Sequence, residues 1–365
     1  MNRSITIDAR MIKNSGIGTY TQNIIDAIAG NYNLTLLGNY DTLTSFSWSK
    51  DVNIIPTTSP IYSISEQTEL PKKIQPCDLF ISPHYNIPLQ GIKASKRAVV
   101  IHDVNHLTNI NRISIIKRLY AKYMINTAIK KSDKVITVSE FSKSEIKKYI
   151  ISKKNISVIY CGLDIRKIKS KINDEQSERI KLKYNLPENY ILFIGNSKPH
   201  KNIDVLIKAM KFPGEFPDTK LVAVGVQHNE ILQKLQTLNS TDLEKKIYTI
   251  NYVENDELPF LYKKARCFVF PSVYEGFGIP PIEAMICGCP VLASNAASIP
   301  EVCGDAALFF NPNDVKKLVD NIISILRNEN LRTELIQKGN KNIERFSLEN
   351  FREKLITNIN DTIAD

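Results

Sequence analysis

Short runs of apolar, β-branched residues alternate along the chain with longer segments in which apolar residues recur at helical spacing. This alternation is typical of parallel sheets whose strands are buried on both faces and joined by helices. In the first half, the runs predict strands at residues 4–9, 33–37, 78–82, 97–102, 134–138 and 158–162. Residues 41–72 show no clear period and are expected to be rich in loops.

The same pattern restarts in the second half. Strands are predicted at residues 190–195, 221–225, 247–251, 267–270, 291–294 and 308–310, with helices over residues 203–210, 314–327 and 330–345. Ser347 has the chemistry of a helix N-cap, and the helix behind it is expected to end near residue 364. The expected fold class is therefore α/β, with two doubly wound parallel sheets.

A lysine-rich stretch with few strand signals separates the two patterns. It is interpreted as a connection between domains that includes one helix. A chain of 365 residues suits two domains of ordinary size. The predicted organisation is a Rossmann-like domain over residues 1–164, a linker over 165–187, a second Rossmann-like domain over 188–346 and a terminal helix over 347–365.

The richest motif follows the predicted strand 267–270. The loop after this strand contains Glu275-Gly276-Phe277-Gly278-Ile279. Pro280 or Pro281 then suits the first turn of a helix, and a glycine loop before a helix N-terminus offers backbone N–H groups to a phosphate. Glu283 follows about one turn inside the helix. Because carboxylates accept hydrogen bonds from hydroxyls, the motif predicts a nucleotide-sugar site, although either glutamate alone fits a solvated or helix-terminal residue equally well.

Polar side chains also stand at strand ends in the first half, where open α/β sheets bind ligands. His84 follows strand 78–82, and His102 with Asp103 ends strand 97–102. The alternatives are a core histidine for His102 and a turn cap for Asp103. A loop over residues 15–20, before a helix to about residue 29, contains Gly16 and Gly18, which suit either a phosphate or a tight turn.

Taken together, the two glutamates, the glycines between them and the run Ile299-Pro300-Glu301-Val302 resemble the signature of retaining family-4 glycosyltransferases of the GT-B fold. The resemblance covers nearly the whole chain, is strongest over residues 256–314 and is weakest in the first domain. It implies two Rossmann-like domains that face a cleft, and a final helix that crosses back to the first domain. No Asp-x-Asp motif follows a strand, so neither a metal ion nor another cofactor is expected.

The resemblance also implies roles for individual residues. In the family, a loop like residues 195–202 binds the donor diphosphate through an arginine and a lysine. Lys201 matches the lysine, but Asn196 stands at the position of the arginine. The second positive charge would then have to come from Lys198 or His200. The implied catalytic residues are His102, Lys201 and Glu275. Those implied for donor binding are Gly16, Gly18, Asn196, Lys198, Gly276, Phe277, Gly278, Ile279 and Glu283. Those implied for the acceptor side are His84 and Asp103.

Composition limits the competing classes. Six scattered cysteines without zinc-site spacing indicate reduced thiols. No run has the length of a membrane span, and the N-terminus lacks the apolar centre of a signal peptide, so a cytoplasmic protein is expected. The net charge of +10 favours anionic partners, but no nucleic-acid motif accompanies it, so nucleic acid is not expected as a partner. The dinucleotide fingerprint of a Rossmann dehydrogenase is absent.

A predicted helix over residues 112–131 combines apolar residues with an excess of Lys and Arg. Packing on a sheet explains such a helix, and so does contact with an anionic membrane surface at the inner face of the cell membrane. The residues concerned are Arg112, Ile115, Ile116, Lys117, Arg118, Leu119, Tyr120, Lys122, Tyr123, Met124, Lys130 and Lys131.

The expected function is transfer of a sugar from a nucleotide-sugar to a carbohydrate acceptor, such as an undecaprenyl-linked one, in bacterial O-antigen and lipopolysaccharide synthesis. GDP-mannose is the first donor expected, because the loop Pro199-His200-Lys201-Asn202 is similar to that of O-antigen mannosyltransferases; dTDP-rhamnose is the second. The alternative class is a nucleotide-sugar epimerase or hydrolase, which would turn over a donor without an acceptor.

Overall fold

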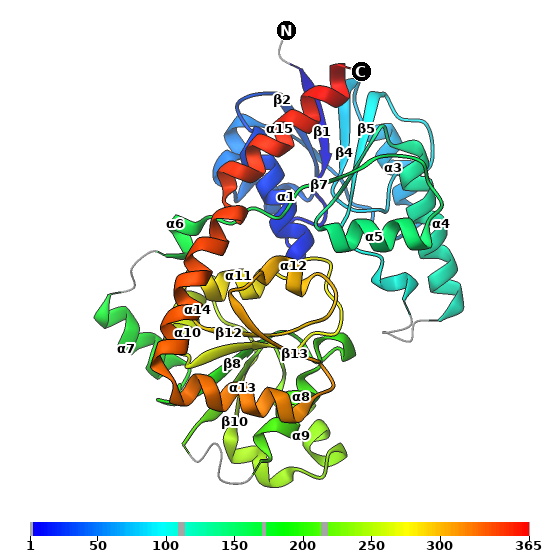
Figure 1. The fold of residues 1–365 in the computed structure, drawn as a ribbon. Helices are drawn as coiled ribbons and strands as arrows, with labels where there is room; N and C mark the ends of the chain where they lie inside the picture. The colour runs from blue at the N-terminus through cyan, green and yellow to red at the C-terminus, as the bar shows by residue number, and fades with distance from the viewer. Residues whose placement is uncertain (1–2, 109–113, 170–172, 213–217, 365) are drawn as a thin grey trace. The chain divides into compact units, whose positions relative to one another are not determined.

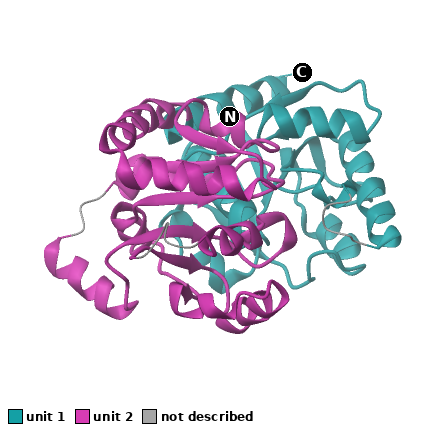
Figure 2. Ribbon diagram, turned by 60° about the horizontal axis from the view of Figure 1, so that its bottom comes forward, with its two compact units in different colours: residues 1–163, 346–365 teal, residues 164–345 magenta. Residues whose placement is uncertain are grey.

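The computed structural model describes residues 3–108, 114–169, 173–212 and 218–364 of the chain (Figure 1). The chain folds into two compact units, coloured separately in Figure 2. Unit 1 comprises residues 1–163 and 346–365, and unit 2 comprises residues 164–345. The stretch interpreted as a linker therefore belongs to unit 2, in which it forms α6 (Ile165–Ile168) and α7 (Asp174–Lys183).

Unit 1 is built on a seven-stranded sheet of order β3-β2-β1-β4-β5-β6-β7. All neighbouring strands pair in parallel, and the strand order reverses between β1 and β4. This reversal is the switch point at which doubly wound sheets bind ligands. The strands are β1 (Ser4–Asp8), β2 (Asn33–Gly38), β3 (Asn53–Pro56), β4 (Cys77–Ser82), β5 (Ala94–Ile101), β6 (Lys134–Thr137) and β7 (Ile156–Val158).

The helices of unit 1 connect these strands, and the last helix of the chain joins them. The N–H of Asn350 donates to Oγ of Ser347 over 3.2 Å, so the predicted cap is confirmed, and α15 packs beside α1 (Figure 1). The helices are α1 (Ser15–Ile28), α2 (Tyr40–Thr44), α3 (Glu66–Lys73), α4 (Ile115–Lys131), α5 (Glu140–Tyr149) and α15 (Leu348–Ala364), with short 3-10 turns at η1 (Ser47–Asp51) and η2 (Asn105–Leu107).

Unit 2 is built on a six-stranded parallel sheet of order β10-β9-β8-β11-β12-β13, whose switch point lies between β8 and β11. The strands are β8 (Tyr190–Ile194), β9 (Lys220–Val224), β10 (Ile247–Ile250), β11 (Cys267–Phe270), β12 (Val291–Ser294) and β13 (Ala307–Phe310). The further helices are α8 (Ile203–Met210), α9 (His228–Thr237), α10 (Leu258–Lys264), α11 (Ile279–Ile286), α12 (Ile299–Cys303), α13 (Val315–Arg327) and α14 (Glu329–Asn342), with 3-10 turns at η3 (Pro199–Lys201), η4 (Thr241–Lys246) and η5 (Ile343–Phe346).

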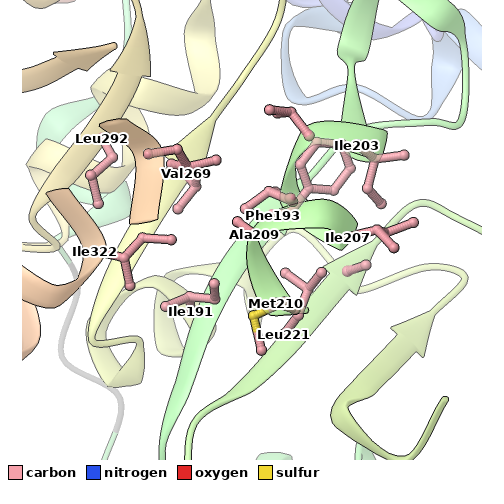
Figure 3. Packing of buried hydrophobic residues seen from close by; sticks show 14 of the residues in the cluster. Ile191, Phe193, Ile203, Ile207, Ala209, Met210, Leu221, Val269, Leu292 and Ile322 are labelled. Carbon is pink, nitrogen blue, oxygen red and sulfur yellow. The ribbon is translucent and has the colours of Figure 1, made fainter. Parts of the chain in front are cut away.

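The core of unit 2 explains why its strands were predictable. Ile191 and Phe193 of β8 pack with Leu221 of β9 and Val269 of β11 (Figure 3). Helix α8 covers this sheet with one apolar face, to which Ile203 and Ile207 belong. Strands that are buried on both faces read as continuous apolar runs, so the two parallel sheets expected from the sequence are confirmed.

Two expectations for unit 1 were wrong. Residues 41–72 are not mainly loop, because they contain η1, β3 and most of α2 and α3. Strand β3 lies at the sheet edge with partly exposed side chains, so no apolar run marks it. The loop expected over residues 15–20 is instead the first part of α1, so Gly16 and Gly18 are helical. A Cβ atom on Gly18 would lie 2.4 Å from the carbonyl oxygen of Ile12, which explains the glycine.

Helix α4 departs from ordinary packing on a sheet. From Ala121 onward it buries an apolar face that includes Met124 and Ile125. Its N-terminal half leaves apolar side chains in solvent: Ile116 is 80% exposed and Leu119 is 62% exposed. The predicted helical residue Arg112 lies outside the described residues.

Candidate active site

The candidate site of unit 2 lies at the carboxyl ends of the adjacent strands β8 and β11. The loop after β8 and the loop after β11 are held together through their backbones. The N–H of Val273 donates to the carbonyl of His200 over 2.8 Å, and the side-chain amide of Asn202 donates to the carbonyl of Pro271 over 3.2 Å. Two loops distant in sequence thus form one rigid edge at the switch point.

Lys201 and Glu275 meet across these two loops. The ammonium of Lys201 lies 2.7 Å from Oε1 of Glu275 and 5.6 Å from the centre of the Phe270 ring. The two charged side chains are only 17% and 15% exposed. A salt bridge that is largely removed from water is much stronger per contact than one at the surface, so each side chain fixes the position of the other.

The glycine loop between the two glutamates is fixed by Ser298, which is fully buried. Its Oγ lies 2.9 Å from the carbonyl oxygen of Glu275 and 2.7 Å from that of Phe277, so its single proton serves one of these acceptors at a time. Gly278 has a positive φ of 113° and forms the N-cap of α11. A side chain would strain this conformation, so glycine is required where the loop enters the helix.

The first turn of α11 carries the expected proline, Pro280. Ile279 begins the helix and is the only one of its first three residues with a backbone N–H, because Pro280 and Pro281 have none; an N–H in the first turn has no partner within the helix. The N–H of Ile279 and the helix dipole make the loop end of α11 attractive to an anion. The arrangement of strand, glycine loop and helix N-terminus expected from the sequence is present.

Glu283 stands inside α11, apart from the Lys201–Glu275 pair. Burial raises the pKa of its carboxyl, while the hydroxyl of Tyr262 donates to its Oε2 over 3.0 Å and partly offsets this effect. Tyr262 is itself buried, with its ring edge-on to Phe268 at a centroid distance of 5.3 Å. Glu283 is therefore a carboxylate with one oxygen held by the protein core, which sets the direction of the other oxygen.

The remaining residues expected to bind the donor lie in the loop after β8. Oδ1 of Asn196 accepts a hydrogen bond of 3.2 Å from the N–H of Lys198, which closes a local turn. Both side chains are exposed. Asn196 thus shapes the loop at the place where the resembling family has an arginine, and Lys198 stands at the surface of the same turn.

In unit 1, a buried ionic network occupies the switch point between β1 and β4. Asp8 ends β1, and its Oδ2 lies 2.8 Å from Arg10 and 3.3 Å from Nε2 of His84. Arg10 also lies 2.8 Å from Oε2 of Glu66. Burial alone would raise the pKa of Asp8, but hydrogen bonds from Arg10 and His84 hold it well below its usual range.

His84 faces this network rather than solvent. Its Nδ1 accepts from the N–H of Asn86 over 3.2 Å, so the neutral ring carries its proton on Nε2, toward Asp8. The side-chain amide of Asn86 donates to Glu66, and its Oδ1 accepts from the hydroxyl of Tyr120 over 3.2 Å. His84 therefore positions its neighbours and does not itself project from the sheet edge.

His102 follows β5 and is held as a neutral ring. Its Nε2 lies 2.9 Å from the carbonyl oxygen of Pro83, which can only accept, so Nε2 carries the proton. Burial lowers the pKa of His102 to about 4. Its ring contacts Tyr20 edge-on at 5.2 Å. Asp103 accepts from the N–H of Asn105 over 2.8 Å, which is the turn-capping contact that the sequence left open.

Sequence reasoning brought out Lys201, Glu275 and Glu283 but missed the residues that hold them. Ser298 stands directly before the run Ile299-Pro300, a position typical of a helix N-cap, so its polar role had a signal. No sequence signal indicated a site role for Tyr262, because a tyrosine among the apolar residues of a short helix is typical of a core residue.

Both units match known protein families. Residues 174–342 match the family of glycosyl transferases group 1, and residues 14–167 match glycosyltransferase family 4. The O-antigen chain mannosyltransferase B of Escherichia coli is 31% identical over 283 residues, which cover 74% of this chain and 71% of that protein. The O-antigen chain mannosyltransferase RfbU of Salmonella typhimurium is also 31% identical, over 75% of this chain and 71% of that protein.

Solved structures share the fold at lower identity. A glycosyltransferase of Rickettsia africae has a TM-score of 0.79 at 20% identity and covers 100% of this chain and 99% of its own. WaaG, a glycosyltransferase involved in lipopolysaccharide biosynthesis, has a TM-score of 0.72 at 15% identity, over 96% of this chain and 98% of its own. The GT-B class expected for the two parallel-sheet units is thereby confirmed. The chain belongs to the group 1 and family 4 glycosyltransferases.

Proposed function

We propose that the protein transfers mannose from GDP-mannose, with retention of configuration, to a lipid-linked carbohydrate in the synthesis of a bacterial O-antigen or lipopolysaccharide. The observation that carries this proposal is the meeting of Lys201, Glu275 and the N-terminus of α11 at one sheet edge. The similarity to two O-antigen mannosyltransferases supports mannose as the sugar. dTDP-rhamnose remains the second donor to be tested.

The diphosphate of the donor would take the place nearest Lys201 and the first turn of α11. Cleavage of the glycosyl–phosphate bond increases the negative charge on the leaving diphosphate, so positive groups held in position stabilise the transition state more than the ground state. The ammonium of Lys201 is such a group, because it is mostly shielded from water and its position is set by Glu275 and Phe270. The N–H of Ile279 and the dipole of α11 add a second attraction for the same charge.

Glu275 would change partners during the reaction. In the structure it neutralises Lys201. An arriving diphosphate competes for the same ammonium, which releases the carboxylate to accept hydrogen bonds from hydroxyls of the donor sugar. Glu283, with one oxygen held by Tyr262, would accept from the ribose. The two glutamates thus serve different parts of one nucleotide-sugar.

The chemical step would need no base from the protein. The acceptor hydroxyl attacks the anomeric carbon from the face that the diphosphate leaves, the bond from carbon to phosphate oxygen breaks, and the leaving phosphate takes the hydroxyl proton. Because His102 is neutral near pH 7, it suits acceptance of a hydrogen bond from a sugar hydroxyl better than donation of positive charge. Lys201 and α11 meet the charge on the diphosphate, so we propose that no metal ion is required.

We also propose that α4 rests on the inner face of the cell membrane. Within the described residues, no helix is long and apolar enough to cross a membrane. The exposed half of α4 instead presents Ile116 and Leu119 beside Lys117 and Lys122, and the helix contains no acidic residue. Apolar side chains that insert between lipids and lysines that meet anionic headgroups are the two forces that hold an interfacial helix. A peripheral enzyme placed in this way would reach a lipid-linked acceptor.

A donor panel tests the catalytic proposal. Purified protein is incubated with GDP-mannose, dTDP-rhamnose or UDP-glucose and a bacterial lipid extract as acceptor, and transfer of label to lipid is measured with and without a chelator. We expect transfer from GDP-mannose that chelator does not reduce. Loss of activity in chelator with rescue by one metal would contradict the metal-independent step, and turnover of a donor without extract would favour an epimerase or hydrolase. Binding of no nucleotide-sugar at all would refute the proposal.

Vesicle flotation tests the membrane contact. We expect binding to vesicles that contain phosphatidylglycerol, weaker binding to pure phosphatidylcholine and loss of binding in the double variant Ile116→Ser/Leu119→Ser. Leu182→Ser is the matched control, because Leu182 is 78% exposed on α7 in the other unit. Equal binding by the double variant and the control variant would exclude α4 as the contact.

A further inference from the structure

We propose that Tyr62, Tyr85 and Tyr120 of unit 1, here called the tyrosine cluster, form a carbohydrate subsite that holds the acceptor sugar. The inference rests on the proposed function, because it supplies a place for the substrate that receives the transferred sugar. From the sequence, Tyr120 was expected only on the helix with the possible membrane contact, and neither Tyr62 nor Tyr85 was expected to be a site residue. They come from three separate segments: the loop between β3 and α3, the turn after β4, and helix α4.

The three aromatic rings gather at the carboxyl edge of the sheet in unit 1. The rings of Tyr62 and Tyr85 lie 6.3 Å apart at an angle of 40°. The ring of His106 meets Tyr85 edge-on at 6.0 Å. Tyr62 is 48% exposed and Tyr120 is 45% exposed. The cluster therefore combines contact among its members with aromatic surface left open to solvent.

Tyr62 is held in an unfavourable backbone conformation. Its φ of 66° lies in the left-handed region, which a bulky side chain rarely adopts. The base of its loop is anchored, because Glu69 accepts from the N–H groups of Thr58 and Ser59 over 3.0 Å and 2.7 Å. A strained residue on an anchored loop keeps its ring in one place, and such strain is concentrated at ligand-binding positions.

Tyr120 is oriented by the buried ionic network of unit 1. Its hydroxyl donates to Oδ1 of Asn86, whose amide donates to Glu66, and Glu66 pairs with Arg10. This chain of contacts leads back to the end of β1 through Asp8. Charged groups buried at the switch point thus fix the direction of an exposed aromatic ring, which gives the network a function beyond folding.

The chemistry of the cluster suits a pyranose ring. A sugar has an apolar C–H face, which an aromatic ring can cover, and a rim of hydroxyls, which need donors and acceptors when they leave water. Burial raises the pKa of all three tyrosines, so their hydroxyls stay protonated near neutral pH. The negative charge of Asp103 also raises the pKa of Tyr62 and Tyr85.

The position of Tyr120 connects this subsite to the proposed membrane contact. Tyr120 lies on α4 one residue after Leu119, in the half of the helix whose apolar side chains are exposed. A substrate with its sugar on the tyrosine cluster would therefore have its lipid close to the surface that meets the bilayer. The tyrosine cluster and the exposed apolar residues of α4 would then serve the same lipid-linked substrate.

Saturation-transfer NMR with methyl α-mannoside and a mannobiose tests the subsite without turnover, with and without GDP. We expect saturation of one sugar face by the wild-type protein, retention of the signal in Tyr62→Phe, and binding weakened about tenfold in Tyr62→Ala. Tyr32→Ala is the matched control, because Tyr32 stands beside the opposite end of the sheet, directly before β2, with its hydroxyl on Asn360. Circular dichroism of all variants verifies that they are folded.

Kinetics with the lipid extract provide a second readout. Tyr62→Ala should raise the KM for the extract about tenfold and leave the KM for the nucleotide-sugar unchanged. The subsite is refuted if neither glycoside binds to the wild-type protein, or if Tyr62→Ala binds glycosides as Tyr32→Ala does. Failure of the proposed function is distinguishable, because calorimetry would then show no binding of GDP, dTDP or UDP, whatever the glycosides do.

Discussion

The ammonium of Lys201 lies 2.7 Å from Oε1 of Glu275, although 74 residues separate them in the chain. Both side chains are mostly shielded from water, so the pair is a specific feature of the switch point between β8 and β11. The same ammonium is the group expected to meet the leaving diphosphate. In the proposed reaction, therefore, a phosphate would compete with the Glu275 carboxylate for this ammonium.

This competition leads to a prediction for Glu275→Gln. The variant should bind a bare nucleoside diphosphate about three- to tenfold more tightly than the wild type, because the phosphate no longer displaces a carboxylate. Its turnover should fall on the order of 10²-fold, because the glutamine no longer supplies a charged acceptor to the sugar. Calorimetry with GDP and steady-state rates measure the two effects.

The control for this prediction is Glu188→Gln, which removes an exposed carboxylate 3.8 Å from Lys181 in the same unit. Glu188→Gln should change neither the affinity for GDP nor the turnover. Weaker binding of GDP to Glu275→Gln would show instead that Glu275 contacts the nucleotide, and its role would then be exchanged with that of Glu283.

Lys201→Met should reduce turnover more than donor affinity. The charge that Lys201 opposes grows as the glycosyl–phosphate bond breaks, so its removal costs more in the transition state than in the bound ground state. We expect a loss on the order of 10²-fold in kcat with a smaller change in the Kd for GDP-mannose. A variant whose Kd rises by as much as its kcat falls would indicate that Lys201 only binds the donor.

The same variant should also lose stability, since Glu275 would be left as a shielded carboxylate without its partner. Denaturant unfolding of Lys201→Met and of Lys201→Met/Glu275→Gln measures this. The double variant should be the more stable of the two by about 1 kcal/mol or more. Equal stability would indicate that water or a backbone donor replaces the lysine.

The sequence predicted best those elements that are buried on both faces. The bounds of β11 (Cys267–Phe270) and α8 (Ile203–Met210) were predicted to the residue, because apolar runs or an apolar face with clear ends define them. The start of α1 was missed, since Ser15 enters the helix at a φ of 37° and Asn14 provides no side-chain cap. Neither signal can be read from residue types alone.

For the candidate site, local motifs showed which residues matter but not how they pair. Glu275 and Glu283 could be found because a glycine loop and a helix N-terminus stand between them. The partners Lys201 and Tyr262 come from other elements, so only the sheet topology shows that they are neighbours. The tyrosine cluster was missed for the same reason, since its members come from three segments without a shared pattern.

Tyr262→Phe should weaken nucleotide binding although Tyr262 is too deeply buried to touch a ligand. Loss of its hydrogen bond to Glu283 should raise the pKa of that carboxyl further, so the acid limit of GDP binding should move to higher pH. Calorimetry across pH 5 to 8 measures the shift. Tyr190→Phe is the control, because it removes a buried hydroxyl bonded to the carbonyl of Leu261 and should leave the profile in place. If GDP binding depends on pH in the same way in both variants, Tyr262 only packs in the core and does not control the pKa of Glu283.

The neutral state of His102 should make stability depend on pH. Burial lowers the pKa of the folded ring to about 4, against about 6.5 for an exposed histidine. Between pH 4 and pH 6.5 the unfolded chain binds a proton at His102 that the folded chain does not. The contribution of His102 to the free energy of unfolding is therefore complete above pH 6.5 and is lost as the pH falls toward 4. The loss should amount to about 3 kcal/mol at most.

Urea unfolding of the wild type and of His102→Gln at pH 7.5, 6, 5 and 4.5 isolates this effect from other groups that titrate with acid. Asp8 and Glu69 also hold depressed pKa values, so both proteins should lose stability through those carboxylates, mainly below pH 5. The difference between the two proteins should shrink steadily from pH 6.5 downward, because only the wild type carries the imidazole. A difference that stays constant with pH would show that the pKa of His102 is the same in the folded and unfolded chains. A difference that grows as pH falls would show that the folded ring is protonated, and its proposed role as a neutral acceptor for a sugar hydroxyl would then be wrong.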